Sequence, residues 1–233
     1  MFSFASTAKI ARFNAMQSNS KLFFMPFFYQ QNINETTHFA IWSIEEPLSY
    51  FEEEMHLLVD IQNEERKIQH LAVRWLLALM MPEIDVANIK VADNGKPYIP
   101  GAGFHFSLSH CKGFAACAIS EKSPIGIDIE ILHDRIAKVA HKFLEEEEKK
   151  LVAEVPVANQ LNHLGFYWAA KEAMYKQYEK NGIDFSKHFI IHPLKLNKEG
   201  MVPAQIKHMD THKEVQLQYV FKDNFVCTVC FDS

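Results

Sequence analysis

The chain has 233 residues, of which 48% are hydrophobic and 23% are charged, a composition typical of a soluble globular protein that forms one large domain or two small ones. The formal net charge is −5, so the overall charge gives no support for nucleic-acid binding. No apolar run approaches the roughly 18–20 residues that a transmembrane helix needs, and we expect no membrane-bound protein.

Residues 1–24 differ in composition from the rest of the chain. They contain no acidic residue and several Ser and Ala, together with Lys9, Arg12 and Lys21. Such a segment is typical either of an organellar transit peptide or of an extension before an internal start at Met25, and we favour the extension. Since no secretory signal is recognisable, we expect the protein in the cytoplasm.

The sequence of the first globular part predicts helices and short strands. Apolar residues at helical spacing predict a long helix over 63–81, with Asn63 as N-cap and Pro82 after its end. The turn signals Asn94-Gly95 and Lys112-Gly113 separate short strands that follow this helix. The expected elements are a strand at 38–42, a helix at 46–58, and strands at 88–92, 97–99, 103–109 and 113–120.

The second part repeats this order after Ser123-Pro124. A strand at 125–131 precedes acidic helical sequence and then a long helix at about 159–180. Further strands are expected at 188–192, 201–207, 214–221 and 225–231. We therefore predict an α+β fold with an extension at 1–24 and two similar halves, 25–124 and 125–233, each a long helix on a small, mainly antiparallel sheet. A site built from both halves would lie in the groove between them.

The four cysteines give little support for a metal knuckle. Cys227 and Cys230 have suitable spacing, but they lie in strand-like sequence and have no second pair at a matching distance. We expect buried thiols in a reducing compartment.

Two acids stand side by side in the strand at 125–131. Asp128 and Glu130 alternate with isoleucines, so both acids point to one face of the strand. That face is either solvated or neutralised by a cation, and oxygen ligands alone would select Mg²⁺ or Mn²⁺.

The helix at 159–180 offers a third acid. Glu172 and Lys176 are one turn apart, and Trp168 lies one turn before Glu172 on the same face. The spacing fits a third metal ligand beside a cation, but also half-buried packing with a surface ion pair. Lys171 points elsewhere and could face solvent, and the run Glu145–Glu148 is expected to be solvated.

Cationic and hydroxyl side chains could bind an anion. Ser109 and His110 are adjacent strand residues that point to opposite faces, which favours anion donors over a catalytic pair. Lys96 and Pro97 follow the Asn94-Gly95 turn, which could equally be an ordinary hairpin tip. Arg66, His70 and Arg74, with Lys67 beside them, form a basic stripe that is either a solvated helix face or a phosphate seat.

Four segments together resemble the 4′-phosphopantetheinyl transferase superfamily in its two-halved, surfactin-synthetase-activating type. They are Gly95-Lys-Pro-Tyr98, Phe106-Ser-Leu-Ser-His110, Gly126-Ile-Asp-Ile-Glu130 and Trp168-Ala-Ala-Lys-Glu172 with Lys176. The resemblance extends from about Met25 to the C-terminus and leaves residues 1–24 outside. It implies a monomer whose halves are related by a pseudo-two-fold axis.

The resemblance implies a reaction in which coenzyme A gives its phosphopantetheine arm to a serine of an apo acyl or peptidyl carrier protein, releasing 3′,5′-ADP. Three acids would hold Mg²⁺, or Mn²⁺, on the diphosphate, and Glu172 would accept the serine proton. The implied metal ligands are Asp128, Glu130 and Glu172. The diphosphate would be bound by Lys176, His110 and Ser109, and the adenine would be flanked by Lys96 and Pro97. The 3′-phosphate would be bound by Arg66, Lys67 and Arg74.

Two other functions remain open at the level of the residues. A Mg²⁺-dependent nuclease or phosphohydrolase could use the same acids, although its common pattern places an acid-x-Lys pair on the strand next to the first Asp. A non-catalytic binder of coenzyme A or of a carrier protein is the third alternative, and the complete acid set argues against it.

Overall fold

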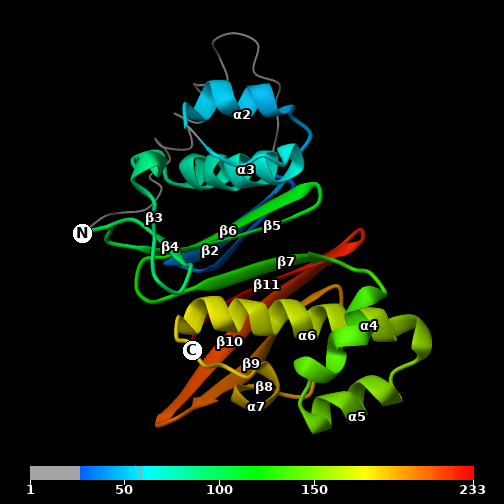
Figure 1. Ribbon diagram of the computed structural model, residues 1–233. Coiled ribbons are helices and arrows are strands. Elements are labelled where there is room, and N and C mark those ends of the chain that lie inside the picture. Colours follow the sequence, from blue (N-terminus) through cyan, green and yellow to red (C-terminus); the bar gives the residue numbers. More distant parts are fainter. Residues whose placement is uncertain (1–26, 58) are drawn as a thin grey trace.

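The computed structural model describes residues 27–57 and 59–233 and has a mixed α+β fold built on antiparallel sheets (Figure 1). The predicted extension at 1–24 lies outside the described residues. No helix in the described part of the chain is long and apolar enough to cross a membrane.

The first part of the chain forms a four-stranded sheet with two helices on one face. The strand order is β1-β2-β6-β5, and the long helix begins after Asn63, whose side chain accepts a hydrogen bond from the Arg66 N–H at 2.9 Å. The elements are β1 (Tyr29–Asn34), β2 (Thr37–Ser43), α2 (Leu48–Met55), α3 (Glu64–Met80), the 3-10 turn η1 (Val86–Asn88), the short hairpin β3 (Lys90–Val91) and β4 (Pro97–Tyr98), β5 (His105–Cys111) and β6 (Phe114–Ser120).

The second part forms a five-stranded sheet with the order β7-β11-β10-β9-β8. A 22-residue helix, α6, packs on it, and two shorter helices precede α6. The elements are β7 (Gly126–Ile131), α4 (Arg135–Val139), η2 (Ala140–Lys142), α5 (Glu146–Glu154), α6 (Val157–Tyr178), α7 (Phe185–His188), β8 (Phe189–Ile191), β9 (Glu199–His208), β10 (Thr211–Lys222) and β11 (Phe225–Asp232).

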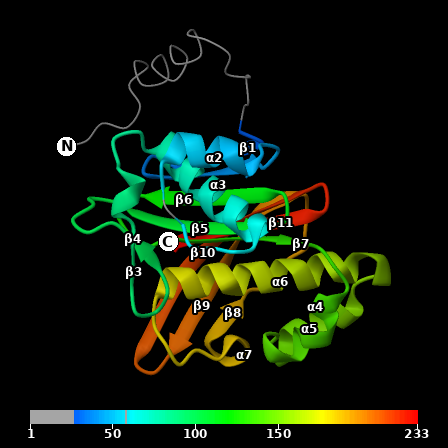
Figure 2. The ribbon, with the colours of Figure 1, turned by 45° about the horizontal axis from the view of Figure 1, so that its top comes forward.

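The two sheets lie face to face, with helices on the outer sides (Figures 1 and 2). One apolar core lies between α3 and the first sheet, and another lies between α6 and the second sheet. A third core joins the sheets and contains Ile41 and Ala118 from one, and Ile127 and Val229 from the other. The layers therefore hold both halves against each other.

Both parts have the same connectivity around their long helix. In the first part, β2 precedes α3 and pairs with β6, the last strand of the β5–β6 hairpin. In the second, β7 precedes α6 and pairs with β11, the last strand of the β10–β11 hairpin. A long helix followed by antiparallel strands was expected in each part, whereas the strand pairings were not predicted.

The main departure from the expected strands is at an edge of the first sheet. A strand at 29–34, which the sequence analysis did not predict, forms the outer edge β1. Cys227 and Cys230 are buried and free, as expected. They belong to different cores on opposite sides of β11, so they cannot act together as ligands.

Candidate active site

Strand β7 lies directly beneath helix α6. A Cβ atom added to Gly126 would lie only 1.9 Å from the Ala173 carbonyl oxygen, so the helix backbone approaches the strand where it has no side chain. The next residues on this face are Asp128 and Glu130. The face of β7 that carries these acids therefore points toward α6. It does not face open solvent, which was one of the two alternatives left open by the sequence.

Asp128 is buried, with 5% of its surface exposed. Its Oδ1 accepts hydrogen bonds from Ser109 Oγ and from Lys176 Nζ, both at 2.8 Å. Its Oδ2 is buried and has no hydrogen-bond partner among the described residues. An unpaired carboxylate oxygen in a buried position is unfavourable unless a further cation or donor satisfies it.

Glu130 and Glu172 extend the acidic cluster. Burial, followed by the charge of Asp128, raises the pKa of each from its ordinary value near 4.5 to about 7. Glu130 Oε1 accepts a hydrogen bond from Trp168 Nε1 at 3.0 Å, which limits the rise of its pKa. Burial and mutual repulsion thus disfavour the ionised state of these carboxylates, and an added positive charge would favour it.

Lys176 lies at the centre of this cluster. Its ammonium donates to the Ile127 carbonyl at 2.9 Å, to Asp128 at 2.8 Å and, more weakly, to the Leu108 carbonyl at 3.4 Å. These acceptors belong to β7 and β5, so one cation from α6 contacts the edge strands of both sheets.

The acids as they stand do not form a closed ligand set. In the described part of the chain, no three His, Cys, Asp or Glu side chains are grouped closely enough to hold a metal ion. Their chemistry nevertheless fits a hard cation, because all three donors are carboxylates and one buried oxygen is unpaired.

Two serines join the sheets beside the acids. Ser107 Oγ accepts from the Ile127 N–H at 3.0 Å, and Ser109 Oγ accepts from the Ile129 N–H at 3.3 Å. These backbone N–H groups at the edge of β7 thereby find their acceptors in side chains of β5 and not in the backbone of a neighbouring strand. Ser109 was predicted as an anion donor, but its buried hydroxyl donates to Asp128 and is already part of the acidic cluster.

His110 points away from Ser109, as the alternation of the strand predicts. Its side chain is largely exposed, and partial burial followed by the charge of Lys176 lowers its pKa. On the neighbouring helix α3, burial lowers the pKa of His70 to about 4, with smaller contributions from Arg74 and His110. His110 therefore lies near one part of the basic stripe.

The basic stripe is not one solvated helix face. Arg74 is largely buried, donates to the His70 carbonyl at 3.1 Å, and has a pKa lowered by burial. Lys67 pairs with Glu52 at 2.5 Å and lines a separate hollow on the first half. Arg66 is exposed. The three predicted phosphate ligands thus lie in three different environments.

A cavity of about 250 Å³ opens beside the acids, between the halves. It is lined by the 94–97 turn, by Ser107 and Leu108 of β5, and by Glu172, Tyr175, Lys176 and Glu179 of α6. Its lining therefore comes from residues on both sides of Ser123-Pro124. Arg66, Lys67 and Arg74 are not part of its lining.

Lys96 has a contact that the sequence could not reveal. Its ammonium donates to the Lys176 carbonyl at 2.9 Å and to the Ile125 carbonyl at 3.3 Å, and it forms an ion pair with Glu179. Asn94 Nδ2 donates to the Glu179 carbonyl at 2.8 Å. The 94–97 turn from the first half therefore caps the C-terminus of α6, where carbonyl groups lack helical partners.

Residues 124–230 match the protein family described as the 4′-phosphopantetheinyl transferase superfamily. A 4′-phosphopantetheinyl transferase of Bacillus subtilis is 34% identical over 97 residues, which make up 40% of this chain and 43% of that relative. The 4′-phosphopantetheinyl transferase Sfp of Bacillus subtilis strain 168 is 26% identical over 152 residues, 64% of this chain and 65% of the relative.

A third relative, the 4′-phosphopantetheinyl transferase HetI of a Nostoc species, is 32% identical over 88 residues and shares 37% of its length with this chain. The chain thus spans between 37% and 65% of the length of these three curated relatives. All three candidate metal ligands lie within the stretch that matches the family. The stretch 124–230 is thus similar to the 4′-phosphopantetheinyl transferase superfamily, the family that the four motifs resemble, and Sfp is among the relatives of the chain.

Proposed function

We propose that this protein transfers the phosphopantetheine arm of coenzyme A to a serine of an apo acyl or peptidyl carrier protein, with Mg²⁺, and releases 3′,5′-ADP. The observation that supports this most directly is the acidic cluster beneath α6. Asp128 pairs there with Lys176 at 2.8 Å, Glu172 and Lys176 line the adjoining cavity, and burial together with the charges of Asp128 and Glu130 raises the pKa of Glu172.

The metal ligands we propose are Asp128, Glu130 and Glu172. When bound, a Mg²⁺ or Mn²⁺ ion would offset the charge of the coenzyme A diphosphate and polarise the attacked phosphorus. The unpaired Asp128 Oδ2 and the raised pKa values of Glu130 and Glu172 support a cation at this position.

Glu172 is the proposed general base. The oxygen of the carrier serine forms a bond to the β-phosphorus of the coenzyme A diphosphate, the bond from that phosphorus to the bridging oxygen breaks, and 3′,5′-ADP leaves. The serine proton passes to the Glu172 carboxylate, directly or through water.

The remaining residues would bind coenzyme A. Lys176 is positioned to exchange part of its contact with Asp128 for a diphosphate oxygen, and His110 would add a further donor. Lys96 and Pro97 would flank the adenine, with the Lys96 ammonium still engaged at the end of α6. Ser109 would act by orienting Asp128.

The 3′-phosphate seat is predicted at Arg66, Lys67 and Arg74. The proximity of Arg74 to His70 and His110 supports Arg74 most strongly. Lys67 would have to leave Glu52 to take part.

The wider expectations belong to the same proposal. We expect a cytoplasmic monomer that binds no nucleic acid, with halves 25–124 and 125–233 related by a pseudo-two-fold axis. The common connectivity of β2-α3-β5-β6 and β7-α6-β10-β11 supports that relation.

The test is a mass measurement on a panel of purified apo carrier proteins, each incubated with this protein, coenzyme A and Mg²⁺. The expected result is a gain of one phosphopantetheine group on at least one carrier, and no gain when Mg²⁺ is chelated. Coenzyme A binding without any gain would indicate a non-catalytic binder. Cleavage of DNA or of phosphate esters in Mg²⁺, without any gain, would indicate the nuclease or phosphohydrolase.

A further inference from the structure

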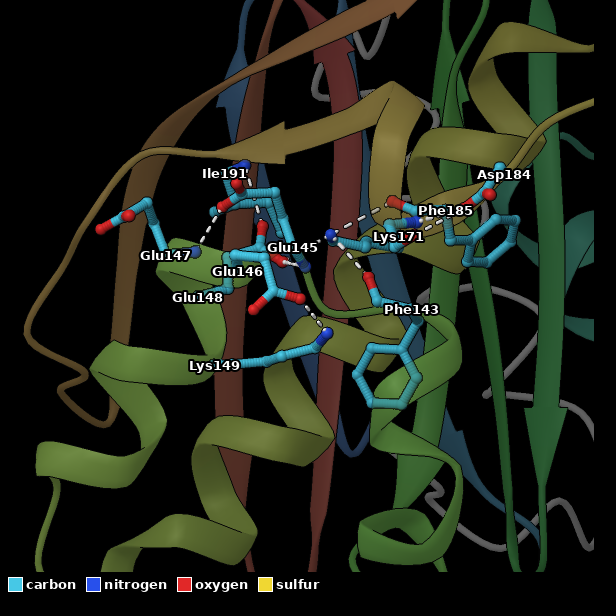
Figure 3. Close-up of polar contacts among 11 residues, drawn as sticks. Phe143, Glu145, Glu146, Glu147, Glu148, Lys149, Lys171, Asp184, Phe185 and Ile191 are labelled. Carbon is cyan, nitrogen blue, oxygen red and sulfur yellow. Dashed lines mark hydrogen bonds and ion pairs between the residues drawn. The ribbon is translucent and has the colours of Figure 1, made fainter.

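A buried ion pair lies on α6 next to the proposed base. Lys171 is fully buried, and its ammonium donates to Glu148 Oε2 at 2.6 Å, to the Phe143 carbonyl at 2.7 Å and to the Phe185 carbonyl at 3.2 Å (Figure 3). The expectation that Lys171 could face solvent is therefore wrong. All three ammonium protons have an acceptor, so the buried charge is fully hydrogen-bonded.

Glu148 completes the network from the other side. It is 2% exposed, which corrects the expectation that the whole run 145–148 is solvated. Its Oε2 also accepts from the Glu145 N–H at 2.8 Å, and its Oε1 accepts from the Ile191 N–H at 3.3 Å. The ion pair therefore ties α6 to the segment before α5, to the start of α7 and to β8.

Two of the tied residues form the packing around Trp168. The Phe143 ring contacts the Trp168 ring edge-on with 5.3 Å between ring centroids, and the Phe185 ring lies at 6.1 Å. Lys171 binds the backbone carbonyls of these same two phenylalanines. Trp168 in turn donates its indole N–H to Glu130 at 3.0 Å.

We propose that Lys171 is a positioning residue for Glu130. The Lys171–Glu148 pair fixes Phe143 and Phe185, these rings hold the Trp168 indole, and the indole N–H sets the direction of the Glu130 carboxylate. The inference rests on the proposed function only in that Glu130 is taken as a metal ligand. Partners that orient a ligand in this way commonly change metal affinity when they are removed.

A purely stabilising role would make a different prediction. An ion pair that only fills space can often be replaced by uncharged residues without consequences elsewhere. Here the replacement should loosen Trp168 in particular, because both of its aromatic neighbours depend on the same ammonium.

The test compares the double variant K171M/E148Q with K150M/E147Q. The first removes both charges together and keeps one side-chain oxygen at position 148, which can accept from one of the two backbone N–H groups that Glu148 binds. The second is a matched control, since Lys150 and Glu147 form an exposed 2.6 Å ion pair on α5, the helix that carries Glu148. W168F serves as the direct comparison, because it keeps a ring and removes the indole donor.

The first readout is hydrogen exchange of the indole N–H groups, measured by NMR without metal or coenzyme A. The chain has 3 tryptophans, so Trp42 and Trp75 act as internal references. In K171M/E148Q, exchange at Trp168 should be roughly tenfold faster while the other two stay unchanged. Unchanged exchange at Trp168, or equal acceleration at all three, would overturn the proposal.

The second readout is the Mg²⁺ concentration that gives half-maximal transfer. It should rise about tenfold to a hundredfold in K171M/E148Q and in W168F, and stay constant in K150M/E147Q. If K171M/E148Q does not fold, F185A replaces it, because it removes one ring of the packing and keeps the carbonyl. The indole readout does not depend on transferase activity, so failure of the proposed function and failure of this inference are distinguishable.

Discussion

The acidic cluster makes a specific prediction about stability and pH. Glu172 has a pKa raised to about 7 in the folded protein, against about 4.5 when it is unfolded. The folded state therefore holds the proton more tightly, and stability falls as the pH rises from about 4.5 to about 7. At 1.36 kcal/mol for each pKa unit, the ionised Glu172 costs the metal-free fold at most about 3 kcal/mol.

Replacing this charge should therefore stabilise the protein at high pH. With metal chelated, Glu172→Gln should be more stable than the wild type by about 1–3 kcal/mol at about pH 8.5, and similar to it at about pH 5. Urea unfolding at both pH values measures the difference. Glu53→Gln is the control, because Glu53 is exposed on α2, and it should change little at either pH.

At high pH, addition of millimolar Mg²⁺ should make the wild type more stable than Glu172→Gln. The wild type gains stability from ligand binding, whereas the Gln variant has lost one proposed ligand and gains less. A Glu172→Gln variant no more stable than the wild type at high pH without metal would contradict this expectation, since burial and the neighbouring acids would then not disfavour the ionised carboxylate.

Three further variants test the contacts around the site. Ser107→Ala leaves the buried Ile127 N–H without its acceptor and should lower the free energy of unfolding by about 1–3 kcal/mol in urea titrations. An unchanged free energy of unfolding would contradict this prediction. Gly126→Ala places a methyl group 1.9 Å from the Ala173 carbonyl oxygen and should destabilise by more than about 4 kcal/mol or prevent folding; a stable, soluble variant would show that α6 can move away. Lys96→Met removes the cap of α6 and should accelerate amide hydrogen exchange in its last turn and not at its start, whereas uniform exchange along the helix would argue against a capping role.

The regular elements could be predicted where local sequence determines them. The helix expected at 63–81 is present as α3 at 64–80, because its apolar period and the Asn63 cap are both local signals. Strand β1 was missed, because its sequence, Tyr-Gln-Gln-Asn-Ile-Asn, is polar and the strand lies at a sheet edge where few side chains need burial.

The site shows the same division between local and distant contacts. The prediction that Asp128, Glu130 and Glu172 act together follows from strand alternation, helix spacing and the order of the family motifs. The burial of Lys171 does not, because its partner Glu148 is 23 positions away and lysine is seldom buried. The capping role of Lys96 depends on how the halves pack, which no local pattern determines.

The central claim is that the acids beneath α6 serve phosphopantetheine transfer. The most direct measurement is the mass of an apo carrier protein after incubation with coenzyme A, Mg²⁺ and either the wild type or Glu172→Gln. We expect the gain of one phosphopantetheine group with the wild type and no gain with the folded variant. The claim would be contradicted by the absence of any gain across a panel of unrelated carriers, or by transfer that survives in Glu172→Gln.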